Sequence, residues 1–180
     1  PEERTTFLNQ ADSVFQGGLT RLGVAVDPGA PNYLFCELWV AEASGLIAYV
    51  DDEPAGWVAV EPRTAYPKLR TSRVPWTGRH EDKSDDGIWA VTCFAVRKGY
   101  RGRGLTYPLA QATIGYARER GARALEAYPM ITQPDKEITW GEVHVGARQV
   151  FEDAGFEQVS RPTVRRVVMR IDFERAGDAR

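Results

Sequence analysis

From residue 46 onward, the sequence shows a clear pattern of short hydrophobic runs separated by polar turns. Residues 46–50 (LIAYV) and 55–60 (AGWVAV) are β-prone runs on either side of an acidic turn at 51–54, which is typical of an antiparallel hairpin. The stretch 61–87 then scatters prolines and glycine among charged residues. This composition predicts a long, mostly surface connection with one helical turn near Lys68.

The most hydrophobic run of the chain follows at 88–96 (IWAVTCFAV). It is too short and too rich in β-branched and aromatic residues for an amphipathic helix, so we predict a central strand that is buried on both faces. A glycine-rich polar segment follows at 97–104. Beyond it, apolar residues recur at helical spacing: Leu105, Leu109, Ala112 and Tyr116. Gly121 ends this pattern. The sequence thus predicts a strand, a glycine-rich loop and a helix in succession.

The last third of the chain repeats this alternation. Residues 124–128 predict a further strand, and 144–154 carry a second helical pattern that ends at Gly155. Two closing strands are expected at 156–159 and 164–171. Strands and helices mixed in this way indicate an α/β or α+β fold.

Size and charge favour one domain and exclude some partners. The 180 residues are 43% hydrophobic and 27% charged, so we expect a single domain over 1–180 with one core. The formal net charge of −2 gives no basic excess for binding nucleic acid or an anionic membrane.

Neither a membrane segment nor a metal site is expected. No run approaches the ~20 apolar residues that span a bilayer, and the first residues lack a signal-peptide pattern, which predicts a cytoplasmic protein. The two cysteines, Cys36 and Cys93, lie far apart without CxxC or Cys/His spacing. We therefore expect no disulfide framework and no metal.

The segment 101–106 (RGRGLT) lies between the buried strand and the first turn of the helix. Glycines allow successive backbone N–H groups to converge, and a helix N-terminus adds unpaired donors and a positive dipole end, so this segment predicts an anion cradle. Nearby cations suit a ligand with several phosphates: Arg97, Lys98, Arg101 and Arg103. The loop matches neither GxxxxGK[ST] nor GxGxxG, because Tyr107 stands where the latter needs a third small residue.

The loop resembles the acetyl-CoA loop of the GNAT superfamily, in which Gln or Arg is followed by two residues, Gly, one residue and then Gly or Ala. Arg101, Gly104 and Thr106 occupy those positions, with Thr106 larger than the usual residue. The neighbourhood 89–128 resembles the family as a whole, as does Ala-Gly-Phe at 154–156. Within the family, 91–96 and 126–129 are similar to a group of bacterial members that mostly lack an assigned substrate.

This resemblance implies a GNAT fold, with a mixed central sheet of about six to seven strands flanked by helices. Two parallel strands of that sheet would splay apart, here those ending at Val96 and Tyr128. The resemblance also implies acetyl-CoA as co-substrate, with no metal, and a homodimer because many members dimerise. The diphosphate of acetyl-CoA would lie on the backbone of Arg101, Gly102, Arg103, Gly104, Leu105 and Thr106. Its pantetheine arm would lie along Phe94, Ala95 and Val96.

The implied reaction is acetyl transfer to an amine of a small molecule or protein terminus by direct attack, which needs a base and can use an acid. The usual acid in the family is a tyrosine, but the matching position is Phe151, so Tyr128, Tyr107 or a water would serve, or the thiolate leaves unassisted. Glu126 is the first candidate base, because burial in an apolar strand raises the pKa of a carboxyl group. It could instead point outward or pair with an arginine.

Other candidates have a catalytic and a structural interpretation. His144 has a suitable intrinsic pKa but could be a helix cap, and Cys93 could carry an acyl group or be a small buried hydrophobe. Tryptophans 39, 57, 89 and 140 could line an acceptor pocket or pack in the core. The acidic group at 81, 82, 85 and 86 could attract a cationic amine or form a solvated loop.

Two other classes stay open at this level. One is a GNAT-like module that binds acyl-CoA without turning it over, which the phenylalanine at 151 favours. The other is a structural or protein-binding α/β domain, in which Gly102 and Gly104 only make a tight turn.

Overall fold

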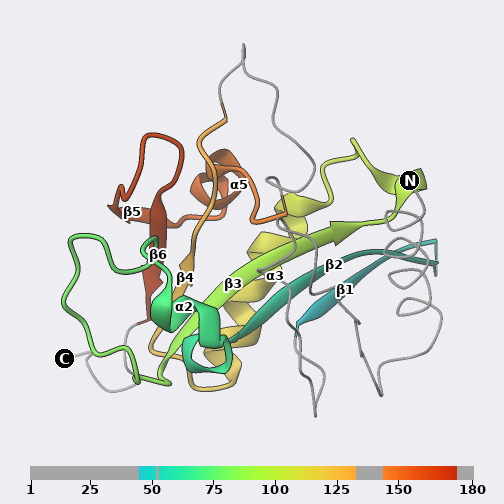
Figure 1. Cartoon of the computed structure of the whole chain (residues 1–180). Coiled ribbons are helices and arrows are strands. Elements are labelled where there is room, and N and C mark those ends of the chain that lie inside the picture. The colour runs from blue at the N-terminus through green and yellow to red at the C-terminus, as the bar shows by residue number, and fades with distance from the viewer. Residues whose placement is uncertain (1–44, 52, 133–143, 174–180) are drawn as a thin grey trace.

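A six-stranded mixed sheet organises the computed structural model, which describes residues 45–51, 53–132 and 144–173 (Figure 1). The strand order is β1-β2-β3-β4-β6-β5. The strands are β1 (Leu46–Val50), β2 (Glu53–Pro62), β3 (Ile88–Val96), β4 (Ala124–Ala127), β5 (Glu157–Ser160) and β6 (Val168–Asp172). The helices are α2 (Pro67–Thr71), α3 (Thr106–Glu119) and α5 (Arg148–Asp153), with 3-10 turns η1 (Arg63–Ala65) and η2 (Lys98–Tyr100). The mixed sheet with flanking helices confirms the predicted fold class.

The hairpin and the central strand form where the hydrophobic runs predict them. β1 and β2 pair antiparallel, and Asp51 turns the chain with a positive φ of 52°. The predicted helical turn near Lys68 is α2. β3 has the predicted bounds and pairs antiparallel with β2, so its position in the middle of the sheet is confirmed.

β3 and β4 are parallel neighbours that separate before β3 ends. Their register runs from Ile88 opposite Ala124 to Val91 opposite Ala127, whereas β3 continues to Val96. The pairing therefore stops while β3 still has residues to offer on that edge. This is the splayed parallel pair implied by the family resemblance.

The segment 144–147 bridges the two strands where they separate. The Phe94 N–H donates to the His144 carbonyl at 2.6 Å, and the Met130 N–H donates to the Gly146 carbonyl at 3.0 Å. Gly146 has a φ of +83°, and a Cβ there would lie 2.8 Å from a ring carbon of Phe151, so only glycine fits. The expected helix over 144–154 is thus wrong in its first turn: α5 begins at Arg148, because the preceding carbonyls bond across the sheet.

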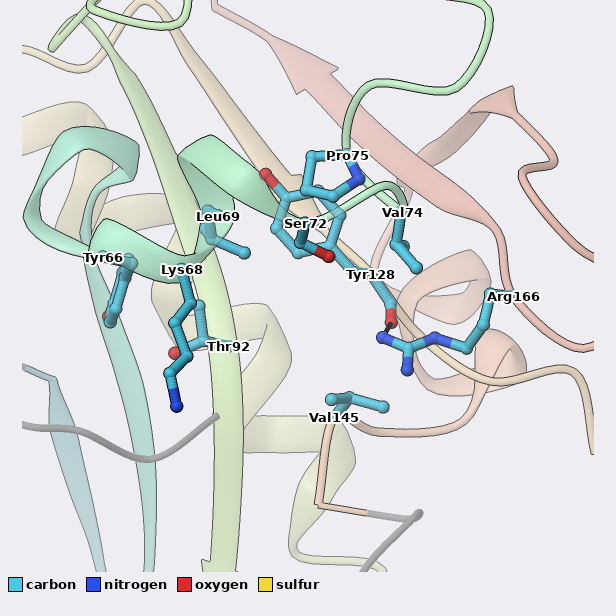
Figure 2. A pocket seen from close by; sticks show the side chains of 10 residues that line it. All are labelled: Tyr66, Lys68, Leu69, Ser72, Val74, Pro75, Thr92, Tyr128, Val145 and Arg166. Carbon is cyan, nitrogen blue, oxygen red and sulfur yellow. Dashed lines mark hydrogen bonds between the residues drawn. The ribbon is translucent and has the colours of Figure 1, made fainter. Parts of the chain in front are cut away.

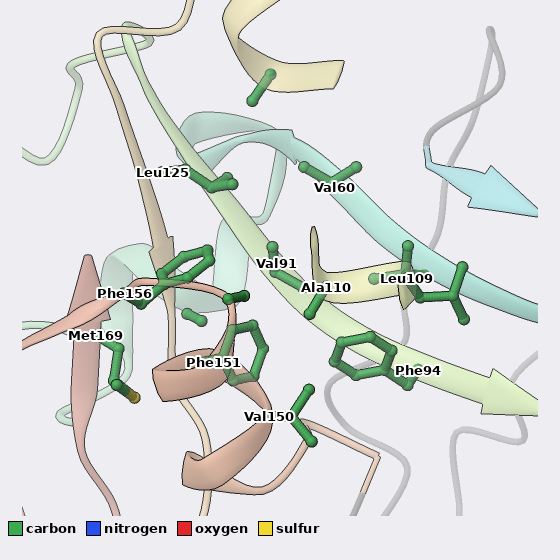
Figure 3. Close-up of a cluster of buried hydrophobic side chains, with 14 of the residues drawn as sticks. Val60, Val91, Phe94, Leu109, Ala110, Leu125, Val150, Phe151, Phe156 and Met169 are labelled. Carbon is green, nitrogen blue, oxygen red and sulfur yellow. The ribbon is translucent and has the colours of Figure 1, made fainter. Parts of the chain in front are cut away.

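The two faces of the sheet carry separate apolar clusters. On the face that packs against α3 and α5, buried residues include Val91, Phe94, Leu109 and Phe151 (Figure 3). On the face covered by α2, the cluster includes Leu69, Cys93 and Tyr128. Figure 1 shows α2 in front of β3 and α3 behind it, so the sheet is covered on both faces as predicted for β3.

Two details of the predicted pattern need correction. The buried residues of α3 are Leu109, Ala110, Thr113 and Ala117, whereas Ala112 is exposed, so the inward face is rotated from the predicted one. The last strand begins at Val168 rather than at Val164, which is 76% exposed. The residues just before β6 pair instead with the continuation of β4, since the Ile131 N–H donates to the Arg165 carbonyl at 2.9 Å.

Candidate active site

The glycine-rich loop leads from the end of β3 into the N-terminus of α3. Gly102 and Gly104 have φ values of +74° and +73°, a region that side chains with a Cβ rarely adopt. α3 has no side-chain hydrogen bond at its N-cap, Leu105, and the Tyr107 N–H donates to the Gly104 carbonyl at 3.0 Å. The positive end of the α3 dipole lies at this loop. The backbone of this loop is suited to hold an anion such as a diphosphate.

Arginines surround this loop at defined places. The Arg97 Nη1 donates to the Pro54 carbonyl at 2.8 Å, and Arg101 Nε donates to the Val96 carbonyl at 2.9 Å. The Arg103 guanidinium lies 5.1 Å from the centre of the Tyr100 ring, a cation–π distance. Arg97 also pairs with Glu53 at 3.7 Å. The loop thus has several guanidiniums close to its backbone.

The end of β3, proposed above for the pantetheine arm, has its edge occupied in this structure. The Phe94 N–H is bonded to the His144 carbonyl, and the Val96 carbonyl is bonded to Arg101. Both groups point to the side from which β4 has diverged. A ligand that adds to this edge must replace or extend these two bonds.

Glu126 lies in a buried ion network rather than in purely apolar surroundings. Its side chain is 0% exposed, and Arg63, Arg79 and Arg170 all pair with it, at 3.3 Å for Arg63 and 3.1 Å for Arg170. The pairing follows from topology, because Glu126 stands opposite Arg170 in the β4–β6 register. Pairing with arginine was one of the alternatives that the sequence left open.

Tyr128 continues β4 and connects this network to the edge of the sheet. Its hydroxyl donates to Glu126 Oε2 at 2.9 Å, and the residue is 3% exposed. Burial, together with the charge of Glu126, raises the pKa of Tyr128 well above its usual value. The phenol therefore keeps its proton and acts as a hydrogen-bond donor.

The remaining catalytic candidates lie in different surroundings. His144 is in the bridging segment and not at a helix start. Tyr107 is 41% exposed in the first turn of α3. Phe151, at the family's tyrosine position, is 0% exposed and packs on Phe94 and Phe156, so it supplies packing and no proton.

The acidic group before β3 is largely used within the protein. Glu81 pairs with Arg63, Arg79 and Arg170; burial acts to raise the pKa of Glu81, but these arginines lower it overall. Asp85 pairs with Arg123, whose hydrogen bond lowers the pKa of Asp85. Asp82 accepts hydrogen bonds from Ser84, and Asp86 is exposed, so two of the four acids are held in ion pairs.

Cysteine and tryptophan side chains serve packing where the structure describes them. Cys93 is 5% exposed within the α2-side cluster, together with Trp57, as expected for a small buried hydrophobe. Trp89 packs edge-on against Tyr116 at 6.1 Å. Cys36, Trp39 and Trp140 lie outside the described residues.

A pocket opens on the α2 side of the sheet, next to the point where β3 and β4 part (Figure 2). Its lining comes from α2 and the turn after it, from β3, from the continuation of β4, from the bridging segment 144–147 and from Arg166 before β6. The lining residues are Tyr66, Lys68, Leu69, Ser72, Val74, Pro75, Thr92, Tyr128, Val145 and Arg166.

Of these residues, sequence reasoning singled out Tyr128 as a site residue. It missed Arg166, and it also missed the partners of Glu126. Arg63 and Glu126 are 63 positions apart, and no local pattern links them. Arg166 and Arg170 stand in a segment predicted as a strand, which was a signal for both, whereas Arg63 and Arg79 lie in the predicted surface connection.

Splayed parallel strands, followed by a glycine-rich loop and an uncapped helix N-terminus, define the class of acetyl-CoA-dependent N-acetyltransferases. The family model described as "Acetyltransferase (GNAT) family" matches residues 17–137. This chain belongs to that family.

Solved structures similar to the chain carry the same family name. The GNAT domain of an S. lividans protein called PAT is 23% identical, with a TM-score of 0.43, over 72% of this chain and 60% of that one. A GNAT-family protein described as a putative acetyltransferase, from Desulfovibrio desulfuricans, is 19% identical, with a TM-score of 0.45, over 71% and 67%. None of the curated proteins compared with the chain matches it significantly.

Two further findings concern the described residues alone. None of their helices is long and apolar enough to cross a membrane. They also contain no group of three or more His, Cys, Asp or Glu side chains placed to hold a metal ion.

Proposed function

We propose that this chain transfers the acetyl group of acetyl-CoA to the amine of a small molecule or protein terminus. The observation that carries the proposal is the loop itself: two glycines at positive φ lead into an uncapped helix N-terminus directly after the central strand. This arrangement suits a diphosphate, and the family match gives the diphosphate its identity as part of acetyl-CoA.

The cofactor contacts are divided between loop and strand in this proposal. The backbone N–H groups of 101–106 hold the diphosphate, and the edge of β3 at 94–96 holds the pantetheine arm as an added strand would. Binding there exchanges the Phe94–His144 and Arg101–Val96 hydrogen bonds. Bound acetyl-CoA supplies the thioester carbonyl that the amine attacks.

For proton transfer we propose Glu126 and Tyr128 as the first pair to test, with His144 as the alternative base. Glu126 touches no open space, so it can act on a substrate only through Tyr128, whose hydroxyl it binds. In that step the phenol takes a proton from the amine as it passes its own proton to Glu126. Tyr128 also lines the pocket, which supports its role if the acceptor binds there.

The experiment that tests the proposal measures CoA thiol release and product mass with the full chain, acetyl-CoA and a panel of amines. Acetylated product with at least one amine is the expected result. Tight acetyl-CoA binding without any product would favour the non-catalytic acyl-CoA-binding module, whereas the absence of binding would favour the structural domain. A thermal shift on adding acetyl-CoA separates these last two outcomes.

The same assay on E126Q, Y128F and H144Q assigns the proton transfers. If Glu126 and Tyr128 form the relay, E126Q and Y128F should each lose turnover and retain their affinity for acetyl-CoA. Full activity of E126Q with loss in H144Q would move the base to His144.

A further inference from the structure

The pocket beside the splayed strands has a positively charged lining. Two of its ten residues are cations, Lys68 and Arg166, and none is Asp or Glu. Its other polar groups come from uncharged side chains: Tyr66, Ser72, Thr92 and Tyr128. A ligand that fills this pocket meets positive charge without a compensating acid in its lining.

Arg166 is the unusual member of this set. Its Nη2 donates to the Tyr128 carbonyl at 2.7 Å, and its Nε is buried without a hydrogen-bond partner. Within the described part of the chain, no carboxylate pairs with it. Burial lowers the pKa of Arg166, which is the cost of holding a cation away from water without a counter-charge.

The other mostly buried guanidiniums on this side of the sheet are treated differently. Arg63, Arg79 and Arg170 each pair with Glu126 and with Glu81. The fold thus supplies carboxylates to three arginines and withholds one from the arginine that faces the pocket. A bound anion would complete the fourth pair.

The position of the pocket links it to the acyl-transfer site. Thr92 lies in a bulge of β3, where the β2–β3 register shifts between Ala59 and Val60, and Tyr128 continues β4 past the last paired residue. Figure 2 shows the Arg166 guanidinium directed between Tyr128 and Val145 toward the middle of the pocket. An acceptor bound here therefore lies next to the β3 edge at 94–96.

We infer that the acceptor is an amine that also carries an anionic group, a carboxylate or a phosphate, which Arg166 binds within the pocket. This inference rests on the proposed acetyl transfer and adds its substrate class. The half-buried Lys68 reinforces the preference from the α2 side. Polycationic amines without an anion are repelled by the same two residues.

Matched pairs of amines test the inference on the full chain. Amino acids are compared with their decarboxylated amines, and phosphoethanolamine with ethanolamine, by CoA release and by calorimetry with the protein alone and with CoA. The anionic member of a pair should be preferred by about 10- to 100-fold in kcat/KM, because a hydrogen bond to a charged group is lost without it. The amino acid pairs test for a carboxylate, and the phosphoethanolamine pair tests for a phosphate.

Substitutions at Arg166 separate binding from structural support. R166Q should raise KM for the anionic acceptor about 10- to 100-fold and remove the preference within each pair, while acetyl-CoA affinity stays the same. R166K should retain part of the preference. The control R161Q changes an exposed arginine in the same connection between β5 and β6. It should change neither KM for the anionic acceptor nor the preference within each pair.

The outcomes keep this inference apart from the proposed function. Equal or better use of the decarboxylated amines, or the failure of every anionic amine to bind in either calorimetric state, overturns the acceptor class alone. Loss of both members of a pair to the same extent in R166Q also overturns it, because it shows a structural role. The absence of acetyl-CoA binding overturns the proposed function instead.

Discussion

Two groups of arginines differ in what surrounds them: one lies at the glycine-rich loop after β3, and the other surrounds Glu126 of β4. Around the glycine-rich loop, Arg101 and Arg103 contact a carbonyl and an aromatic ring, and Arg97 pairs with the exposed Glu53 at 3.7 Å. Around Glu126, three guanidiniums are taken up by carboxylates. The sequence makes these arginines look alike, but the second group is bound to a buried carboxylate and the first lies at the surface loop.

This difference separates binding from stability. A buried guanidinium that has its carboxylate is satisfied and ties elements together, here the end of β2, the connection after α2, β4 and β6. A guanidinium that lacks one is available for an anion. Arg166 differs from the second group: its Nε is buried without a hydrogen-bond partner, and no carboxylate among the described residues pairs with it.

The largest expected effect comes from removing the central carboxylate of the buried group. E126Q leaves three guanidiniums without their shared charge, so we expect the free energy of unfolding to fall by about 3 kcal/mol. Denaturation in urea measures it. The control is E81Q, whose carboxylate is 40% exposed and should cost about 1 kcal/mol or less. Equal destabilisation by the two variants would show that burial does not set the strength of this network.

The next largest effect concerns the glycine-rich loop at 101–106. G104V places a β-branched side chain at a φ of +73°, which distorts the cradle, so acetyl-CoA affinity should fall about 100-fold through lost charge-assisted hydrogen bonds. Calorimetric titration measures this loss. G115A is the matched control, because a Cβ at this glycine in α3 would meet no atom within 4 Å. Unchanged affinity in G104V would count against the loop as the cofactor site.

The smallest effect is expected at Tyr128, whose hydroxyl binds the central carboxylate of the buried group. Y128F removes the hydroxyl bonded to Glu126 and should lower kcat about 10- to 100-fold, with KM for acetyl-CoA unchanged. Because the folded-state pKa of Tyr128 is raised, its phenol stays protonated as pH increases, so it should cause no alkaline loss of kcat up to about pH 10. A Y128F enzyme with full kcat would remove this residue from the proton path.

The features that the sequence could predict are the local ones. The bounds of β3, the loop and the turn at α2 follow from apolar runs, glycines and prolines within a few residues. The bridging segment was missed because its carbonyls bond across the sheet to Phe94 and Met130, which no helical spacing at 144–147 reveals.

The surroundings of the candidate site were less predictable. The apolar neighbours of Glu126 in sequence suggest a carboxyl group in an apolar strand, but Arg170 lies opposite it in β6 and Arg63 and Arg79 approach from the connection after β2. The charge balance of a buried group depends on long-range topology. Which of Arg63, Arg79, Arg166 and Arg170 pairs with a carboxylate therefore becomes clear only from the folded chain.

A crystal structure of the full chain with CoA tests the central claim most directly. The account predicts that the diphosphate lies within hydrogen-bonding distance of the backbone N–H groups of 102–106, at the N-terminus of α3. A diphosphate bound on another face, with the backbone of Gly102 and Gly104 untouched, would contradict it.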